Sequence, residues 1–231
     1  MVFVDNCYGE FVEALEPPSV GADLIAGSLI KNPGGTLVRT GGYVAGRPSL
    51  VAAAKNRLAA PGVGGGATLG QNGLVLQGLF LAPTTVGESL KGAMLCAEVL
   101  GGVYGLECNP PPGARRTDMI QAIKLRKRDR LIKFCEEVQK ASPVGAHIRP
   151  TPGATEGYGD EVIFADGCFV DGATAELSAD GPLREPFTVF AQGGTHHMHW
   201  AIVLEAAIEA MGLDELRLEP AGGQGGGQGV D

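Results

Sequence analysis

The first fifth of the chain alternates apolar runs with turn-forming residues. Residues 1–5 and 22–30 are apolar and predict two buried strands, and residues 42–46 predict a third. Pro33 and the glycines that follow it predict a turn directly after the second strand. Because a buried parallel strand needs neighbours on both sides, the first run predicts partner strands beyond those visible in this sequence.

Two helices are predicted next, separated by a glycine-rich stretch. A proline at an early helical position favours a helix from Pro48 to about residue 59. Residues 61–73 predict a loop, and a long helix is expected over residues 84–100. Apolar positions fall on more than one face of that helix, which is typical of packing inside a large assembly. We therefore expect a second subunit to cover part of it.

From residue 103 onward the apolar runs become shorter and predict a smaller α/β domain. The expected strands cover residues 103–107, 119–125, 161–166, 174–178 and 187–191. They surround a predicted helix at 129–141, and a final amphipathic helix at 197–211 closes the domain. The pattern divides the chain into residues 1–101, residues 102–215 and a glycine- and glutamine-rich tail, 216–231, which is expected to be disordered.

Composition indicates a globular protein of a reducing compartment. Hydrophobic residues make up 44% of the chain and charged residues 19%, which favours a packed core over disorder. The net charge of −8 argues against a nucleic-acid partner, and the basic run at 124–130 is interpreted as a solvated helix start or a subunit contact. No apolar stretch reaches the length of a membrane span. The five cysteines are scattered singly, so we expect a cytoplasmic protein.

Three polar residues follow the predicted strands at the edge where open α/β sheets bind ligands. Asp5 ends the first strand, and Ser28 and Lys31 lie at the end of the second. Pyridoxal phosphate (PLP) needs a lysine that condenses with its aldehyde and a carboxylate beside its pyridine nitrogen, and Lys31 and Asp5 can supply these groups. A hydroxyl at Ser28 can donate to the phosphate. Spacing alone leaves open that Lys31 is a surface residue and Asp5 a turn residue.

Two other motifs are not supported by their context. Ser28 and Lys31 match the S-x-x-K pattern of penicillin-binding enzymes, but those enzymes place it at a helix start and add S-D-N and K-T-G, which do not occur in this sequence. Residues 62–67 match G-x-G-x-x-G/A, yet they follow a helix and do not join a strand tightly to a helix. We expect a flexible loop there, one that lines a neighbouring subunit's active site.

Several long segments resemble the methionine gamma-lyase-like family, whose members are also described as aluminium resistance proteins. The segments are 4–11 (VDNCYGEF), 21–35 (GADLIAGSLIKNPGG), 40–47 (TGGYVAGR), 77–83 (QGLFLAP), 116–118 (RTD), 121–124 (QAIK) and 176–186 (ELSADGPLREP). The resemblance implies an α/β chain that corresponds to the C-terminal portion of a fold-type-I PLP-dependent transferase. Residues 1–101 would then be part of the large PLP-binding domain with its linking helix, and residues 102–215 the small C-terminal domain.

The family is similar to the cystathionine lyases, which implies a site and an activity. The implied protein is a homo-oligomeric, PLP-dependent C–S lyase whose substrate is a sulfur-containing amino acid. By position, Lys31 matches the Schiff-base lysine, Asp5 the pyridinium partner and Ser28 a phosphate contact. Lys31 would also move the proton of the substrate Cα. Tyr8 has two open interpretations, a place near the cofactor and a place in the core.

The resemblance also implies an arginine that binds the substrate carboxylate. Arg184 is the candidate, because it lies in a predicted turn that the resemblance places near the cofactor. An ion pair of Arg184 with Asp180 or Glu185, which would only fix the turn, is an equal alternative. Arg149 is a weaker candidate, since its surroundings depart from the family pattern.

His196, His197 and His199 crowd the start of the final predicted helix. Positions i, i+1 and i+3 do not share one helix face, and no carboxylate or cysteine lies nearby in the sequence to complete a metal site. We therefore expect helix-start and interface roles for these histidines, and no metal.

Members of the family carry a substantial segment before the strand that ends in Asp5. In the family that segment supplies the main phosphate loop and the ring that stacks on the pyridine. Its absence from this sequence predicts an incomplete chain. Two alternatives stay open: a catalytically inactive chain that serves as a binding or pairing module, and a PLP enzyme of another reaction type, such as an aminotransferase.

Overall fold

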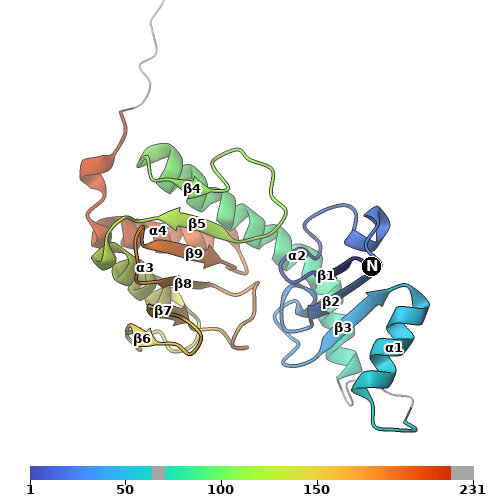
Figure 1. The fold of residues 1–231 in the computed structure, drawn as a ribbon. Helices are drawn as coiled ribbons and strands as arrows, with labels where there is room; N and C mark the ends of the chain where they lie inside the picture. The colour runs from blue at the N-terminus through green and yellow to red at the C-terminus, as the bar shows by residue number, and fades with distance from the viewer. Residues whose placement is uncertain (64–70, 220–231) are drawn as a thin grey trace, which may run out of the picture.

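The N-terminal part of the chain forms a three-stranded sheet. The computed structural model describes residues 1–63 and 71–219. Strand β1 (Phe3–Asp5) pairs in parallel with β2 (Leu24–Ser28), which pairs antiparallel with β3 (Gly42–Gly46). Helix α1 (Pro48–Leu58) follows and packs on β3 (Figure 1). The three predicted strands and this helix are confirmed, but β1 is not buried in this chain, because Phe3 is 58% exposed.

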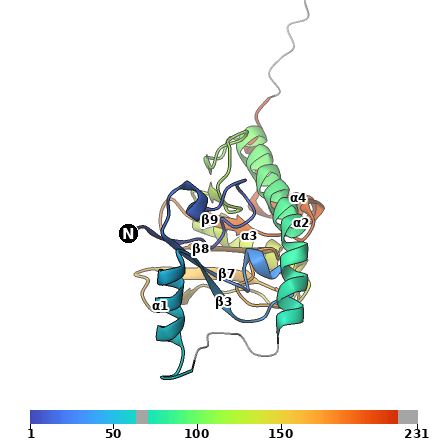
Figure 2. The ribbon, with the colours of Figure 1, turned by 90° about the vertical axis from the view of Figure 1, so that its right-hand side faces the viewer.

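A single long helix, α2 (Asn72–Cys96), leads from the first sheet to the second part of the molecule (Figures 1 and 2). Residues Ala97–Val103 continue it as a π-helical segment. The expected start at residue 84 was wrong by twelve residues, because Pro83 lies inside the helix. An internal proline removes one backbone hydrogen bond, but the preceding turns of α2 are held by packing against the 3-10 turn η2 (Asn32–Gly34).

The second part contains a six-stranded antiparallel sheet. Its strands are β4 (Cys108–Asn109), β5 (Gln121–Lys124), β6 (Gly153–Ala154), β7 (Glu161–Asp166), β8 (Ser178–Pro182) and β9 (Thr188–Gln192). The order across the sheet is β4-β5-β9-β8-β7-β6. Three predicted strands are confirmed within a few residues. The prediction of a strand at 103–107 was wrong, since these residues form no strand. The strand expected at 174–178 begins only at Ser178, because residues 167–177 form a loop held by side-chain hydrogen bonds.

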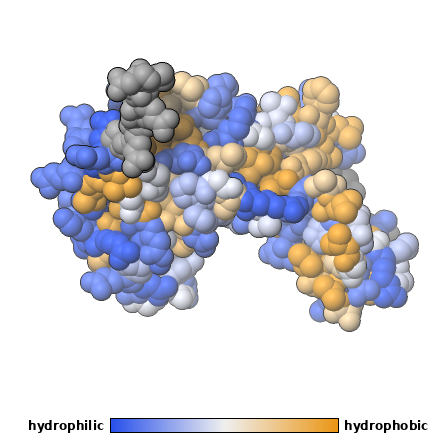
Figure 3. All heavy atoms as spheres, turned by 90° about the horizontal axis from the view of Figure 1, so that it is seen from above, coloured by the Kyte–Doolittle hydropathy of each residue, from blue (hydrophilic) through white to orange (hydrophobic). Residues whose placement is uncertain are grey.

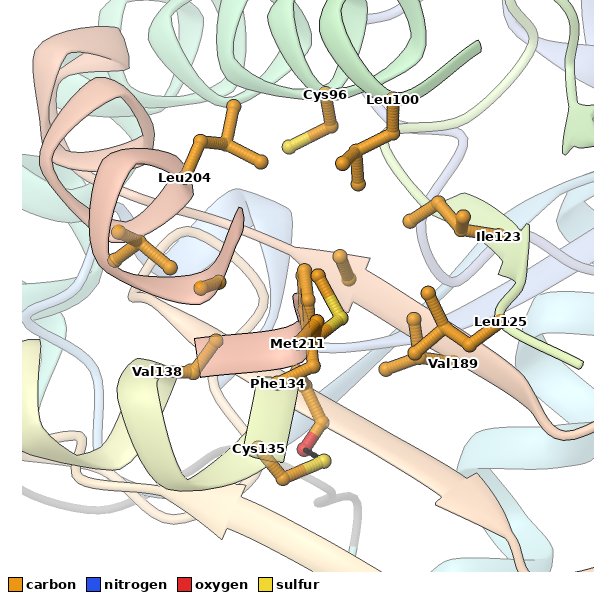
Figure 4. Close-up of a cluster of buried hydrophobic side chains, with 14 of the residues drawn as sticks. Cys96, Leu100, Ile123, Leu125, Phe134, Cys135, Val138, Val189, Leu204 and Met211 are labelled. Carbon is orange, nitrogen blue, oxygen red and sulfur yellow. Dashed lines mark hydrogen bonds between the residues drawn. The ribbon is translucent and has the colours of Figure 1, made fainter. Parts of the chain in front are cut away.

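The main core lies between this sheet and the helices that cover it. Helices α3 (Arg128–Ala141) and α4 (His197–Met211) pack on each other, and α4 also packs on α2. Figure 4 shows side chains from all three helices and from the sheet converging on one apolar centre. Phe134 and Trp200 stack there with ring centroids 6.2 Å apart. Each large apolar side chain buried in this way contributes about 1.5–3 kcal/mol, so this cluster is the main source of stability.

The remaining sequence expectations concern cysteines, charge and membranes. All five cysteines are free, and four of them are buried. The basic run forms surface ion pairs, as Lys124 and Arg126 both contact Glu107. Across the described residues, no helix combines the length and apolar character that crossing a bilayer requires. The predicted loop at 62–67 and the tail beyond residue 219 lie largely outside the described residues.

Candidate active site

The candidate site lies where β1 and β2 end side by side. The two strands are parallel, with Asp5 opposite Ala26, so their C-terminal ends meet at one edge of the sheet. Asp5 is the last residue of β1, and Ser28 is the last residue of β2. Lys31 follows three residues later, at the start of η2. The topology therefore brings together the three residues that the sequence suggested.

Asp5 is held as an ionised carboxylate. Its Oδ1 accepts a hydrogen bond of 3.1 Å from the Cys7 backbone N–H. That bond and, after it, the Cys7 thiol lower the pKa of Asp5; burial raises it, and the positive charge of Lys31 lowers it by the smallest amount. An ionised, exposed carboxylate at a strand end can accept a hydrogen bond from a protonated ring nitrogen.

The Lys31 ammonium is positioned by two partners from distant parts of the chain. Its Nζ donates to the Tyr8 hydroxyl at 3.1 Å and to the Gly172 carbonyl oxygen at 3.3 Å. It also lies 4.6 Å from the centroid of the Tyr8 ring, within the range of a cation–π contact. Tyr8 had two open interpretations, near the cofactor or in the core, and the structure places it beside the candidate cofactor lysine.

Tyr8 reaches this position through an uncommon backbone conformation. Its φ is +73°, in the left-handed region that bulky residues rarely occupy. Such a conformation costs about 1–3 kcal/mol and persists only where the surrounding structure enforces it. Here the loop after β1 turns sharply and directs the ring under Lys31. The strain is thus located at the residue that contacts the candidate lysine.

The turn that carries Lys31 is fixed by Asn32, which is fully buried. Its Nδ2 donates to the Glu10 carbonyl at 3.0 Å, and its Oδ1 accepts a hydrogen bond from the Thr174 hydroxyl. These bonds tie the turn both to the loop after β1 and to the loop that contains Gly172. Because Asn32 follows Lys31 directly, this anchor limits the movement of the lysine backbone.

Glycines let the same turn lie directly on α2. Gly35 adopts φ +50°, and a Cβ at this position would lie 2.4 Å from the Gly78 carbonyl oxygen. A Cβ at Gly78 would in turn lie 2.4 Å from the Gly34 carbonyl oxygen. Real side chains do not tolerate such distances, so glycine is required on both sides of this contact. The long helix therefore acts as a rigid support for the turn of Lys31.

Ser28 lies at the base of the turn. Its Oγ accepts a hydrogen bond of 3.3 Å from the Ile30 backbone N–H. A hydroxyl has one proton to donate besides its lone pairs, and no acceptor for that proton is found among the described residues. The side chain is half-buried, so the hydroxyl can still donate to a group at the strand ends.

A buried polar network lies behind the site. Glu10 is 4% exposed, and its Oε1 accepts a hydrogen bond of 2.7 Å from the Tyr43 hydroxyl. Burial raises the pKa of Glu10 and, together with the bond to Glu10, that of Tyr43. Asn6 donates to both the Tyr43 hydroxyl and the Glu16 carboxylate. The network braces the loop that carries Tyr8 against β3.

Arg184 is not brought to this site within the chain. It is 65% exposed, and its Nη1 lies 3.4 Å from Asp160 Oδ2, so its partner is neither Asp180 nor Glu185. Asp160 directly precedes β7, whereas the Gly172 loop follows the other end of that strand. A strand of this length spans about 17 Å, so Arg184 and Lys31 lie at opposite ends of β7. Arg149 pairs with Glu136 on α3 at 2.6 Å.

Sequence reasoning did not find two partners of the site. The Gly172 carbonyl is a backbone group, and no side-chain pattern could have revealed it. Asn32 had a weak signal, as a polar residue between a lysine and a proline in an otherwise apolar segment. Both become visible only when the loop before β8 folds back onto η2.

One family of known proteins matches most of this chain. The family model described as methionine gamma-lyase matches residues 1–212. The chain belongs to the methionine gamma-lyase family. This bears out the resemblance of the segments around Asp5 and Lys31.

Members of this family with curated sequences or solved structures are similar over nearly the whole chain. An uncharacterized protein of Bacillus subtilis, YnbB, is 48% identical over 213 residues, which are 91% of this chain and 50% of that protein. A Listeria innocua structure, described as a candidate cystathionine beta-lyase involved in aluminum resistance, superposes with a TM-score of 0.86 at 49% identity. It is matched over 90% of this chain and 52% of its own.

A carbon-sulfur lyase involved in aluminum resistance from Clostridium novyi gives a TM-score of 0.82 at 46% identity, over 89% of this chain and 48% of its own. The α/β architecture expected from the sequence is thus shown by these structures. The chain spans about half the length of the Bacillus subtilis relative and of each of these two structures.

Proposed function

We propose that this chain forms part of a PLP-dependent C–S lyase that acts on a sulfur-containing amino acid, with Lys31 as the residue that binds the cofactor covalently. One observation carries the proposal. A lysine and an ionised carboxylate lie at the adjacent ends of two parallel strands, Asp5 as the last residue of β1 and Lys31 in the turn after β2. Names of related structures, which describe cystathionine beta-lyase and carbon-sulfur lyase, support the same reaction class.

The residues present fit the cofactor. Lys31 offers a primary amine. Its Nζ donates hydrogen bonds to two neutral groups, the Tyr8 hydroxyl and the Gly172 carbonyl, and not to a carboxylate. Asp5 is ionised and exposed, as required of a partner for a protonated pyridine nitrogen. Ser28 offers a free hydroxyl proton, which suits a phosphate oxygen. These three residues would hold PLP, and when bound it supplies an electron sink for the electron pair left at the substrate Cα.

The chain's own residues would then perform the proton transfer. The neutral amine of Lys31 accepts the Cα proton at Nζ, within a geometry set by the Tyr8 hydroxyl and the Gly172 carbonyl. Asp5 keeps its negative charge throughout, because its hydrogen bonds to Cys7 stabilise the ionised form. In the overall reaction the bond from carbon to sulfur breaks and a thiol leaves.

We retain Arg184 as the residue that binds the substrate carboxylate, but in the site of a different subunit. Since Arg184 and Lys31 lie at opposite ends of β7, Arg184 would serve the site of another subunit in a homo-oligomer. Exposed apolar side chains on the first half of α2 support such an assembly; they are Leu74, Leu76, Leu79, Phe80 and Leu81. Apolar areas also mark the surface around the first sheet, on the right of Figure 3. Free cysteines support a cytoplasmic location.

The test is to locate the lysine that PLP modifies. The purified chain is mixed with PLP, reduced with borohydride and digested, and the modified lysines are measured by mass spectrometry. We expect Lys31 to be modified in preference to the surface residue Lys55, with a yellow absorbance band that Lys31→Ala abolishes and Lys55→Ala leaves unchanged. Equal modification of Lys31 and Lys55, without a band that depends on Lys31, would overturn the proposal.

A further inference from the structure

A second cluster of reactive side chains lies where α2 meets the start of α4. Glu88 comes from the middle of α2, and His196 and His197 come from the first residues at the α4 terminus. Within the described part of the chain, one carboxylate oxygen and two ring nitrogens of these residues all lie within 4.8 Å of one another. The tertiary structure thus supplies the carboxylate that the sequence around the histidines lacked.

One carboxylate oxygen of Glu88 lies near a ring nitrogen of each histidine. His197 Nδ1 lies 2.8 Å from Glu88 Oε2, and His196 Nε2 lies 4.0 Å from the same oxygen. The two imidazole rings are stacked, with centroids 4.5 Å apart. The other nitrogen of His196, Nδ1, accepts a hydrogen bond from the Met198 N–H. Coordination of a metal through Nε2 would place the ring proton on Nδ1, so this bond would be released and the ring could turn toward Glu88.

A metal ion fits this geometry with little movement. Zinc binds imidazole nitrogen and carboxylate oxygen at about 2.0–2.2 Å, so two ligands of one ion lie about 3.4 Å apart in a tetrahedral site. The separation of His196 Nε2 from Glu88 Oε2 must therefore decrease by about 0.6 Å, and that of His197 Nδ1 from the same oxygen must increase by about 0.6 Å. His196 is 62% exposed and His197 is 34% exposed, so both rings have room for these small movements, whereas Glu88 is only 15% exposed.

The contacts of Glu88 divide between its two carboxylate oxygens. Its Oε2 accepts the His197 backbone N–H at 3.0 Å and lies 2.8 Å from His197 Nδ1. Lys91 occupies Oε1, which leaves Oε2 as the atom that faces both histidines.

We propose that Glu88, His196 and His197 form a binding site for a divalent transition-metal ion of the zinc class, with water completing the coordination. Two imidazoles and one carboxylate are a donor set that zinc and its neighbours prefer, and calcium or magnesium would not select imidazole. The bound ion would link α2 to α4. This inference does not depend on the proposed PLP chemistry, because none of its residues belongs to the Lys31 site.

A competing explanation is that Glu88 only caps α4, since its Oε2 also accepts the His197 N–H at 3.0 Å. The two explanations differ in the effect of Lys91. As a metal ligand, Glu88 should bind the ion more tightly when the competing ammonium is removed. If Glu88 only caps α4, the chain should not bind zinc at this cluster, and Lys91→Ala should have no effect on zinc binding.

The experiment is a calorimetric titration of the purified 231-residue chain with Zn²⁺. A Cys7→Ser background is used, because Cys7 is the cysteine that is not buried. We expect one zinc per chain and a higher melting temperature in its presence. His197→Ala should weaken binding by more than the roughly 10- to 100-fold that loss of an outer-sphere partner produces. His147→Ala, which changes an exposed histidine outside the cluster, should leave the affinity unchanged.

Two further variants keep the result interpretable. Glu88→Gln retains a hydrogen-bond acceptor for the α4 terminus, so a folded Glu88→Gln protein with lost zinc binding supports the site. Lys91→Ala should bind Zn²⁺ several-fold more tightly than the parent chain. No saturable zinc binding by the parent, or equal binding by the parent and His197→Ala, would overturn the proposal.

Discussion

The Lys31 ammonium lies 3.1 Å from the Tyr8 hydroxyl and 4.6 Å from the centroid of the same ring. One aromatic side chain thus provides both an acceptor and a π face for the candidate cofactor lysine. The two contacts are separable by mutation, because phenylalanine retains the ring and leucine retains neither feature. They give the first prediction.

Tyr8→Phe should lower the preference of PLP for Lys31 over Lys55, because a hydrogen bond that positions the amine is lost. A bond to a charged group contributes about 1.5–3 kcal/mol when buried and less here, so a loss of about fivefold is expected. Tyr8→Leu should reduce it further, since the cation–π contact of about 0.5–1 kcal/mol is also removed. The ratio of modified Lys31 to modified Lys55 measures both effects. A ratio unchanged in Tyr8→Leu would show that Tyr8 does not position the lysine.

Two glycines of α2 should respond oppositely to alanine. Gly78→Ala places a Cβ 2.4 Å from the Gly34 carbonyl oxygen, and the resulting overpacking should destabilise the chain by about 1–3 kcal/mol. Gly87→Ala meets nothing within 4 Å and should stabilise the same helix by about 0.5–1 kcal/mol. Urea denaturation gives the free energies of unfolding. If Gly78→Ala were as stable as Gly87→Ala, the close contact between α2 and η2 would be wrong.

Tyr43→Phe tests the buried network behind the site. Removing the hydroxyl leaves Glu10 Oε1 without its donor in a buried position, which should destabilise the chain by about 1–3 kcal/mol. Tyr158→Phe is the matched control, because Tyr158 is 63% exposed, and it should change the stability by less than about 0.5 kcal/mol. Thermal or urea unfolding compares the two variants. Equal stability of both would mean that the Glu10–Tyr43 bond is not formed in solution.

Asp180→Asn should stabilise the chain at neutral pH and not in acid. Burial, followed by the charge of Asp166, raises the pKa of Asp180 to about 6, above its ordinary value of 3.8. The folded state therefore binds more protons than the unfolded state between these values, and stability is lost as pH rises through that window. Asparagine carries no charge and avoids this loss, which is at most about 3 kcal/mol.

The Asp180 prediction is checked by measuring unfolding of both proteins at several pH values. The gain in stability from Asp180→Asn should be full above about pH 6 and should disappear below about pH 4. A gain that is the same at all pH values would show that the charge of Asp180 is not the cause.

The sequence by itself determined the local elements and the residues of the candidate site. Strands β1, β2 and β3 and helices α1, α3 and α4 could be predicted, because their apolar periodicity and their proline and glycine signals are local properties. Asp5 and Lys31 could be named as candidates because each lies at or just after the C-terminal end of a strand, and parallel strands place these ends at one edge; their roles came from the family resemblance. Helix α2 was predicted too short at its N-terminal end. The turns before Pro83 are maintained by the packing of Gly78 against Gly34, a residue far away in the chain.

Only the tertiary structure decided which distant groups meet. The Gly172 carbonyl reaches Lys31 across 141 residues, and Glu88 reaches His197 across 109 residues. Arg184 is likewise separated from Lys31 because Arg184 pairs with Asp160 before β7, whereas Lys31 contacts Gly172 after β7. Such relationships arise when elements pack, because packing is set by the summed burial of many side chains and not by any local pattern. The strand ends were therefore predictable, whereas the partners that position their side chains were not.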